Sequence, residues 1–264
     1  MKQITLLILN TASLIFALVM NGLSNTGAFN GKTVGEASAE LETLFAPAGY
    51  AFSIWGVIYI LLIMFVGRQW VAWFKHTDDL ELKNTGIWFA LSNIANGTWI
   101  VAWLNGYIGV SVILMLILLI SLIALTVKLR LEIWHAPKRV IFFVWWPICI
   151  YLGWIIVASV ANIAAFLVSI NWQGGNLSAE VWTIIIITAA AIIYLLLIYF
   201  RNLREAALVG IWALIAIAVK QWEVQPAIVT AAIAAAALLF IAISINAYKN
   251  NAAKQFSKQV INCM

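Results

Sequence analysis

The residues best suited to ligand chemistry are aromatic and amide side chains that recur at helical spacing inside apolar segments. In the segment 146–172, Tyr151, Trp154, Ala158 and Asn162 occupy positions i, i+3, i+7 and i+11, so they share one face of a helix. Lipid alone would accept leucine at all of these positions. We therefore expect something other than lipid to contact this face.

Two earlier apolar segments carry faces of the same kind. Trp55 and Tyr59 are four residues apart, and Asn96 and Trp99 are three apart, so each pair shares a helix face. If the three faces converge, they would line a pocket for a flat, largely apolar ligand held by aromatic contacts and a few hydrogen bonds. The predicted ligand-binding residues are Trp55, Tyr59, Asn96, Trp99, Tyr151, Trp154, Ala158 and Asn162.

The polar members of this set have two interpretations. Tyr59, Asn96, Tyr151 and Asn162 would either orient the ligand or tie neighbouring helices together, because amide and hydroxyl side chains often form hydrogen bonds across membrane helices. The sequence leaves both interpretations open.

Side chains for other kinds of chemistry are scarce. His76 and His135 lie in predicted loops, and no group of His, Cys or carboxylate residues in the apolar segments has metal-ligand spacing. Nucleophile and phosphate-binding motifs are absent, and Lys220 fits a helix end better than a retinal attachment site. The lack of ionisable residues inside the predicted spans argues against an ion-coupled transporter. The sequence therefore predicts no metal site and no catalytic residue, and favours a binding protein over an enzyme.

Apolar segments of membrane-crossing length must position these residues. Of the 264 residues, 65% are hydrophobic and 9% are charged, against about 25% charged residues in a soluble domain. A helix that crosses the bilayer core needs roughly 20 apolar residues. The predicted spans are 4–23, 48–69, 86–104, 108–128, 140–170, 180–200, 205–221 and 226–247. The seventh of these is either a short tilted helix or part of a re-entrant hairpin with the eighth.

Basic residues divide unequally between the two sides of this predicted topology. Lys32 and Lys220 lie on one side, and the other 13 of the 15 Lys and Arg residues lie on the side that holds both termini. The positive-inside rule then predicts cytoplasmic termini, in a bacterial inner membrane. The same bias accounts for the net charge of +5, so no nucleic-acid partner is implied. The long loop 24–47 on the opposite side is either a lid or a flexible connector.

These motifs resemble those of the TspO/MBR family, the tryptophan-rich sensory proteins related to the mitochondrial translocator protein. The resemblance covers residues 1–172. The second helix of that family carries a Pro, a Trp eight residues later and a Tyr four residues further, as Pro47, Trp55 and Tyr59 do here. The chain departs from the family here, because the Phe-Pro pair of the family's second helix is replaced by Ala51-Phe52 and the Pro is lost.

The third and fifth helices of the family carry matching elements as well. An Asn-x-x-Trp element is matched by Asn96 and Trp99, and a Tyr-x-x-Trp-x-x-x-Ala-x-x-x-Asn element is matched by the face that begins at Tyr151. This chain also departs from the family pattern in two places, because Val101 and Ile150 stand where the family usually has Pro.

The resemblance implies an all-α polytopic membrane protein, with a five-helix bundle of TspO type followed by about three additional transmembrane helices. The predicted division is a TspO/MBR-like domain at 1–174, additional helices at 175–248 and a cytoplasmic tail at 249–264. Family members bind porphyrins, haem, isoquinoline- and benzodiazepine-like compounds and cholesterol, in a pocket that opens near the loop between the first two spans. They often dimerise. Trp55 and Trp154 match the tryptophans that are tied to light-dependent porphyrin breakdown in some bacterial members.

Three functional hypotheses follow. The leading one is an integral membrane binding or sensory protein for a planar hydrophobic ligand, tetrapyrrole- or sterol-like, with porphyrin or haem as a ligand rather than a fixed cofactor. The second is an accessory or scaffold subunit of a larger membrane complex, docked through the Ala/Ile/Leu-rich 176–247 helices. The third is a light-dependent porphyrin-degrading enzyme. The expected partners are the lipid bilayer, a small hydrophobic ligand, and either a second copy of the chain or a larger complex.

Overall fold

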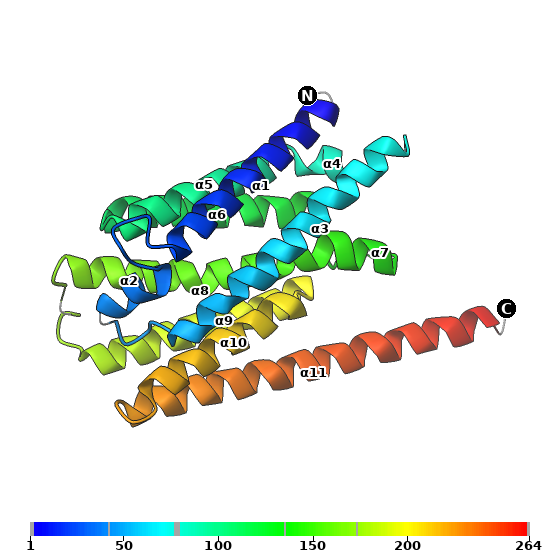
Figure 1. Ribbon diagram of the computed structural model, residues 1–264. Coiled ribbons are helices and arrows are strands. Elements are labelled where there is room, and N and C mark those ends of the chain that lie inside the picture. The colour runs from blue at the N-terminus through cyan, green and yellow to red at the C-terminus, as the bar shows by residue number, and fades with distance from the viewer. Residues whose placement is uncertain (1–2, 42, 77–79, 135, 173, 263–264) are drawn as a thin grey trace.

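The computed structural model of the protein is a bundle of helices (Figure 1) that describes residues 3–41, 43–76, 80–134, 136–172 and 174–262. The α-helices are α1 Gln3–Asn25, α2 Val34–Glu40, α3 Ile54–Phe74, α4 Leu80–Thr85, α5 Trp88–Leu104, α6 Ile108–Lys128, α7 Lys138–Val140, α8 Trp146–Ser169, α9 Ala179–Arg201, α10 Arg204–Gln221 and α11 Pro226–Asn262. A 3-10 helix, η1 Gly49–Ser53, precedes α3, and a π-helix, η2 Ile141–Trp145, precedes α8. The described ranges contain no strand, and His135 lies outside them.

A helix occupies each of the eight predicted spans. Six helical segments are long and apolar enough to cross a membrane: Gln3–Asn25, Gly49–Phe74, Ile108–Lys128, Lys138–Ser169, Ala179–Arg201 and Pro226–Asn250. The all-α polytopic membrane fold is thereby confirmed. α11 continues to Asn262 and so includes most of the segment 249–264, whose assignment as a cytoplasmic tail stays a prediction.

The two other helices, α5 and α10, are shorter or more polar because they are surrounded by protein. α5 has 17 residues, and α10 has 18 residues with charges at both ends. Most residues of each helix are buried, and half of those buried in α10 are alanine. A helix enclosed by other helices needs small residues for close approach more than it needs the bulk of a lipid-facing surface. α10 is a single helix of 18 residues, about 27 Å long. Of the two forms predicted for the seventh span, it is closer to the short helix than to the re-entrant hairpin.

The region before the predicted site contains a local change of helix type. Pro147 is the second residue of α8 and follows the π-helix η2 directly, and because proline has no N–H it donates no hydrogen bond to the preceding turn. The five residues before α8 form the π-helix η2. The predicted span 140–170 is therefore three joined helical pieces, with the regular helix beginning just ahead of Tyr151.

The last three helices pack directly on the first part of the chain. In Figure 1, α8 runs through the middle of the bundle, with α1, α5 and α6 on one side of it and α9, α10 and α11 on the other. α8 and α10 approach closely at Gly153, where an added Cβ would lie 2.6 Å from the carbonyl oxygen of Ala206. The hydroxyl of Tyr194 in α9 donates to the Gly153 carbonyl oxygen at 2.6 Å. One continuous hydrophobic core therefore joins the two parts.

α10 also holds the segment that leads into α3. Three hydrogen bonds join them, from Gln221 Nε2 to the Leu44 carbonyl (3.0 Å), from the Ala48 N–H to the Ala216 carbonyl (3.1 Å) and from Trp212 Nε1 to the Ala51 carbonyl (3.2 Å). The ring of Tyr50 meets that of Trp212 edge to face, with centroids 5.3 Å apart. Residues 44–51 are thus fixed in place by a helix more than 160 residues further along the chain.

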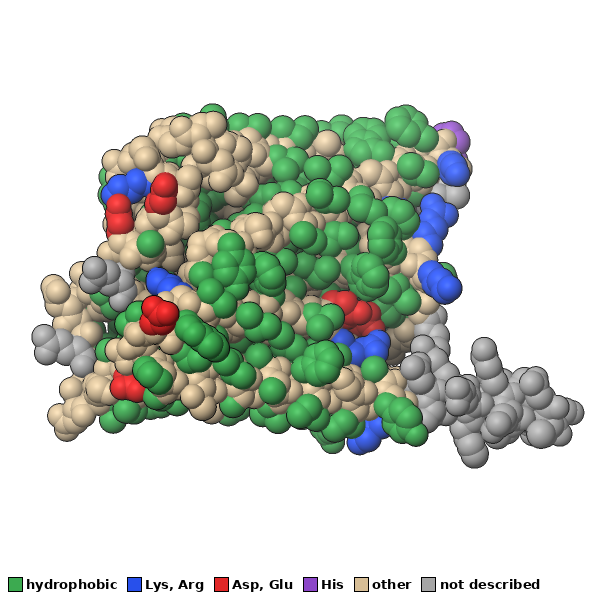
Figure 2. Space-filling model, turned by 60° about the horizontal axis from the view of Figure 1, so that its bottom comes forward, with side chains coloured by type: hydrophobic (Ala, Val, Ile, Leu, Met, Phe, Trp, Pro, Cys, Tyr) green, Lys and Arg blue, Asp and Glu red, His purple; other side chains and the backbone are tan. Residues whose placement is uncertain are grey.

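The surface fits a protein embedded in a bilayer. Figure 2 shows a face that is mostly hydrophobic, with Lys and Arg side chains gathered along its right-hand edge. Acidic side chains are prominent at the opposite edge. Some Lys and Arg side chains also lie near the left-hand edge, and an acidic patch lies right of centre, so the basic side chains are biased to one edge and the charges are not fully separated. Such a bias is what the Lys and Arg counts of the loops predict, while the orientation of the termini stays a prediction.

Candidate ligand-binding site

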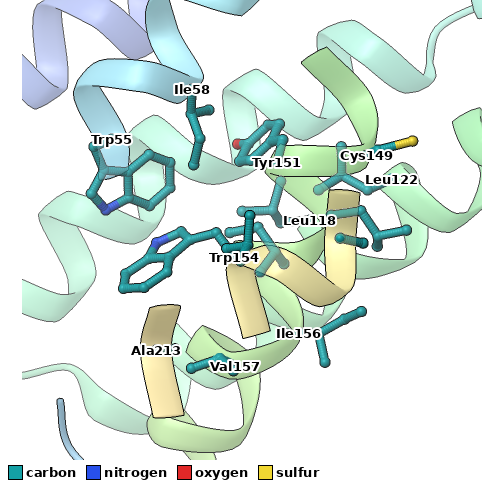
Figure 3. Close-up of a cluster of buried hydrophobic side chains, with 14 of the residues drawn as sticks. Trp55, Ile58, Leu118, Leu122, Cys149, Tyr151, Trp154, Ile156, Val157 and Ala213 are labelled. Atoms are coloured by element: carbon teal, nitrogen blue, oxygen red, sulfur yellow. The ribbon is translucent and has the colours of Figure 1, made fainter. Parts of the chain in front are cut away.

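Aromatic side chains from α3 and α8 form a cluster at the centre of the bundle. Trp55 stacks on Tyr59, with ring centroids 5.5 Å apart and planes 21° apart. Its ring meets Tyr151 and Trp154 edge to face, at centroid distances of 5.9 and 6.4 Å. Phe52 meets Trp154 at 5.8 Å in the same manner. Figure 3 shows Trp55, Tyr151 and Trp154 lying close together across the interface between the two helices.

A buried hydrogen-bond network links three helices beside this cluster. Asn96 Nδ2 in α5 donates to the hydroxyl oxygen of Tyr151 at 2.7 Å and to that of Tyr59 at 3.3 Å. All three side chains are buried. The Asn96 amide of α5 therefore joins α3 to α8. These are the three helices that were expected to converge.

A second polar chain continues toward α6. Trp99 Nε1 donates to Asn162 Oδ1 at 2.8 Å, and Asn162 Nδ2 donates to Ser111 Oγ at 2.8 Å. The Ser111 hydroxyl in turn donates to the Ile108 carbonyl at 2.7 Å. Both amides thus tie helices together, which is one of the two roles the sequence left open for them.

We expect Asn96→Leu to lower the free energy of unfolding by about 1 kcal/mol, because two buried tyrosine hydroxyls lose their amide partner. Thermal unfolding in detergent, followed by circular dichroism, measures the change. Asn105→Leu is the matched control, since Asn105 is exposed at the end of the same helix and bonds only to the Val101 carbonyl. Equal unfolding midpoints for the two variants would show that the network adds nothing to stability.

A narrow cavity lies against these aromatic rings, and we call it the aromatic cavity. Its volume is about 30 Å³, which is room for about two water molecules. The lining residues are Val34, Ser38, Thr43, Pro47, Phe52, Trp55, Trp99, Trp103, Trp154, Val157, Ala158, Ala161, Asn162 and Ala165. Helices α2, α3, α5 and α8 and the segment 43–47 therefore all contribute to its wall.

The predicted site residues divide into two groups in the structure. Trp55, Trp99, Trp154, Ala158 and Asn162 line the aromatic cavity. The other three, which are Tyr59, Asn96 and Tyr151, do not line it and form the hydrogen-bonded network. Whether any of them binds a ligand stays a prediction.

Several lining residues were missed by the sequence reasoning although their spacing carried a signal. Val157, Ala161 and Ala165 extend the face of Trp154 at helical intervals. Phe52 lies three residues before Trp55, and Trp103 lies four after Trp99, stacked on it at a centroid distance of 5.7 Å. Small and aliphatic residues were overlooked because they look like ordinary membrane-helix residues.

The wall of the aromatic cavity carries one buried polar group without a partner. The indole Nε1–H of Trp154 makes no hydrogen bond, although the side chain is buried. Figure 3 shows this nitrogen on the edge of the ring nearest Trp55. A buried donor without a partner is costly, so an acceptor atom that reached this N–H would bind favourably. The lining contains no charged side chain, and no group of metal-ligating residues occurs in the described part of the chain.

Helix α2 covers the aromatic cavity as a small lid. Its first turn is stabilised by a capping box, in which the Thr33 backbone N–H donates to Glu36 (2.8 Å) and the Glu36 N–H donates to the Thr33 hydroxyl (3.3 Å). The Thr33 backbone N–H and the Thr33 hydroxyl both donate to the Glu36 carboxylate, and these two hydrogen bonds lower the pKa of Glu36. The lid is joined to α5 by a long hydrogen bond, from Trp103 Nε1 to the Val34 carbonyl at 3.4 Å. The loop 24–47 therefore contains an ordered helix, whose Val34 and Ser38 line the cavity, while its action as a lid stays a prediction.

The fold and the buried aromatic face define a polytopic helical membrane protein with a small apolar cavity enclosed by its helices. The family model described as TSPO-like protein matches residues 7–245, and the chain belongs to this family. The match extends through the last three helices as well as the first five. No curated protein and no solved structure matches the chain. Membership of this family favours a membrane ligand-binding or sensory protein.

Proposed function

We propose that the protein binds a planar hydrophobic molecule, tetrapyrrole- or sterol-like, in the aromatic cavity between α3, α5 and α8. The observation that carries the proposal is the aromatic composition of the cavity wall. Four tryptophans, Trp55, Trp99, Trp103 and Trp154, line one apolar space, and the buried indole N–H of Trp154 has no partner. Indole rings offer large flat contact areas, and the free donor would orient a carbonyl or carboxyl oxygen of the ligand.

The size of the aromatic cavity requires that a wall move before such a ligand enters. Ligand pockets commonly have volumes of about 300 to 1,000 Å³, whereas this cavity has about 30 Å³. The segment 44–51 is held by three hydrogen bonds to α10. The lid α2 is joined to α5 by the long bond from Trp103 to the Val34 carbonyl. We infer that α2 is the wall that moves. It would move outward, to the side of the membrane that holds the loop between the first two spans.

The packing of the last three helices favours the binding hypothesis over the scaffold hypothesis. α10 is mostly buried, and it supports the cavity wall through Gln221 and Trp212. These contacts give the extra helices a role within the chain itself. The scaffold hypothesis has no corresponding observation.

Trp154→Phe is expected to weaken protoporphyrin binding about 10-fold, because phenylalanine keeps part of the ring contact and removes the free donor. Quenching of tryptophan fluorescence by protoporphyrin, titrated in detergent, measures the dissociation constant. Trp222→Phe is the matched control, since Trp222 is exposed in the turn after α10. Wild-type protein that shows no saturable, stoichiometric quenching would refute the proposal.

Illumination of the same samples addresses the enzymatic hypothesis. That hypothesis requires loss of porphyrin absorbance in the light, dependent on Trp55 or Trp154. Stable porphyrin absorbance in the illuminated wild-type protein would exclude degradation and leave the binding hypothesis.

A further inference from the structure

A second and larger cavity lies where α8 meets α9, and we call it the aliphatic cavity. Its volume is about 390 Å³, within the range of about 300 to 1,000 Å³ that is common for ligand pockets. The lining residues are Thr43, Leu44, Phe45, Val160, Ile163, Ala164, Leu167, Val168, Trp172, Gly174, Ala179, Trp182, Thr183 and Ile186. None of the predicted site residues is among them.

The two cavities lie on different faces of α8. Ala161 and Ala165 line the aromatic cavity, whereas Ala164 and Leu167 line the aliphatic one. Thr43 is the residue that contributes to both. The aliphatic cavity is therefore a separate space, divided from the aromatic cavity by α8 and by the segment that begins at Thr43.

The walls of the aliphatic cavity select against charge and against hydrogen-bonding ligands. Its lining is mostly apolar, with branched aliphatic side chains such as Leu167 and Ile186, and contains no charged residue. The hydroxyl of Thr183 is already used, because it donates to the Ala179 carbonyl at 2.8 Å. A ligand here would gain free energy almost entirely by burying apolar surface.

The opening of this cavity faces the surroundings of the helix bundle. Ile163, Val168 and Trp172 line the cavity and keep 40%, 44% and 42% of their surface exposed. Ile163 and Val168 lie in the last two turns of α8, and Trp172 follows the end of that helix. A molecule dissolved in the bilayer can therefore reach the cavity sideways, without passing the lid α2.

The rim of the aliphatic cavity is held in place by a tryptophan pair and a hydrogen bond. Trp172 and Trp182 pack with ring centroids 5.0 Å apart, and Trp182 Nε1 donates to the Gly174 carbonyl at 3.0 Å. Gly174 has a φ of +76°, and an added Cβ would lie 2.3 Å from the Trp182 ring, so only glycine fits. Paired indoles with a fixed polar edge suit the level of a membrane interface.

The inner wall is equally well supported. Phe45 is 1% exposed, and the carbonyl of its neighbour Leu44 accepts the hydrogen bond from Gln221. α10 thus holds the side of the cavity that lies deepest in the protein. The space is kept open by packing on both sides.

We propose that the aliphatic cavity is a second binding site, which takes the uncharged hydrocarbon chain of a molecule dissolved in the membrane. The chain lies among the branched side chains of α8 and α9, and its polar end lies beside Trp172 at the rim. This site is independent of ligand binding in the aromatic cavity.

Photolabelling with a long-chain alcohol that carries a diazirine on its chain tests the proposal. The full-length protein is reconstituted in phosphatidylcholine nanodiscs, illuminated and mapped by peptide mass spectrometry. We expect labels on residues of 160–168 and 183–186, and competition by an excess of the same alcohol without the diazirine. Ala164→Phe, which fills the cavity from α8, should reduce this competed labelling at least about 10-fold.

Two further variants make the outcome decisive. Ile163→Trp fills the cavity from its exposed side and should act like Ala164→Phe, with less risk to folding. Ala234→Phe is the matched control, because Ala234 is an exposed residue of α11 that lines neither cavity. Labelling that spreads over all lipid-facing helices without competition, or that is unchanged in both filled variants, would overturn the proposal. Porphyrin is absent from the assay, so a failure of the function proposed for the aromatic cavity would not alter this result.

Discussion

Replacing Ala161 with tryptophan is expected to weaken protoporphyrin binding about 100-fold, the largest effect on affinity foreseen for this protein. Ala161 lies on the α8 face that lines the aromatic cavity, between Ala158 and Ala165. These three small residues leave the space that the four tryptophans surround. An indole at position 161 would occupy that space and exclude a planar ligand, even after the lid has moved. Fluorescence quenching by protoporphyrin measures the loss.

The control for this experiment separates a blocked site from a disturbed fold. Overfilling a packed region typically costs about 1 to 3 kcal/mol, so thermal unfolding of the Ala161→Trp variant must be recorded beside the titration. Ala234→Trp places the same indole on the exposed surface of α11 and should bind as the wild type does. Wild-type affinity in a folded Ala161→Trp variant would place the ligand somewhere other than the aromatic cavity.

Gly153→Val is expected to have the largest effect on stability, lowering the free energy of unfolding by about 3 kcal/mol. A Cβ at this position would lie 2.6 Å from the Ala206 carbonyl oxygen and 2.8 Å from the Ala206 Cα. Both are backbone atoms of α10, so a side-chain rotation cannot relieve the overlap. The helices would have to separate, which would also strain the hydrogen bond from Tyr194 to the Gly153 carbonyl. Thermal unfolding in detergent measures the change.

Gly56→Val provides the comparison, because Gly56 lies in α3 with no atom within 4 Å of an added Cβ. The same side chain enters a membrane helix in both variants, and only the first meets a neighbouring backbone. Similar unfolding midpoints for the two variants would show that α8 and α10 do not depend on close approach. A drop confined to Gly153→Val would show that the last three helices stabilise the first five.

The sequence was most informative where a contact depends on the period of a single helix. Trp154, Ala158 and Asn162 were expected to share a face, and all three line one cavity. Helical spacing also put Trp55 and Tyr59 on one face of the second span, and Trp55 lines the same cavity. A regular helix fixes the direction of each side chain relative to its neighbours, so such faces can be found without knowledge of the fold.

The sequence was less informative about what each face meets. Tyr59, Asn96 and Tyr151 have the spacing of ligand-binding residues, yet they bond to one another. Spacing alone cannot distinguish a ligand from a neighbouring helix, because both satisfy the same polar groups in an apolar medium. α10 shows the same limit. Its alanine-rich sequence looks like a weak membrane span, because the sequence does not reveal that other helices surround it.

By itself the sequence determined the class of this protein, an all-α polytopic membrane protein of a TSPO-like family, because membrane length and helical period are local properties of a chain. The tertiary structure decided how the aromatic cavity is closed. The bond from Gln221 to the Leu44 carbonyl joins residues 177 positions apart and supports a wall that no periodic pattern describes. Contacts of that kind depend on how helices are arranged in space, which their separate sequences leave open.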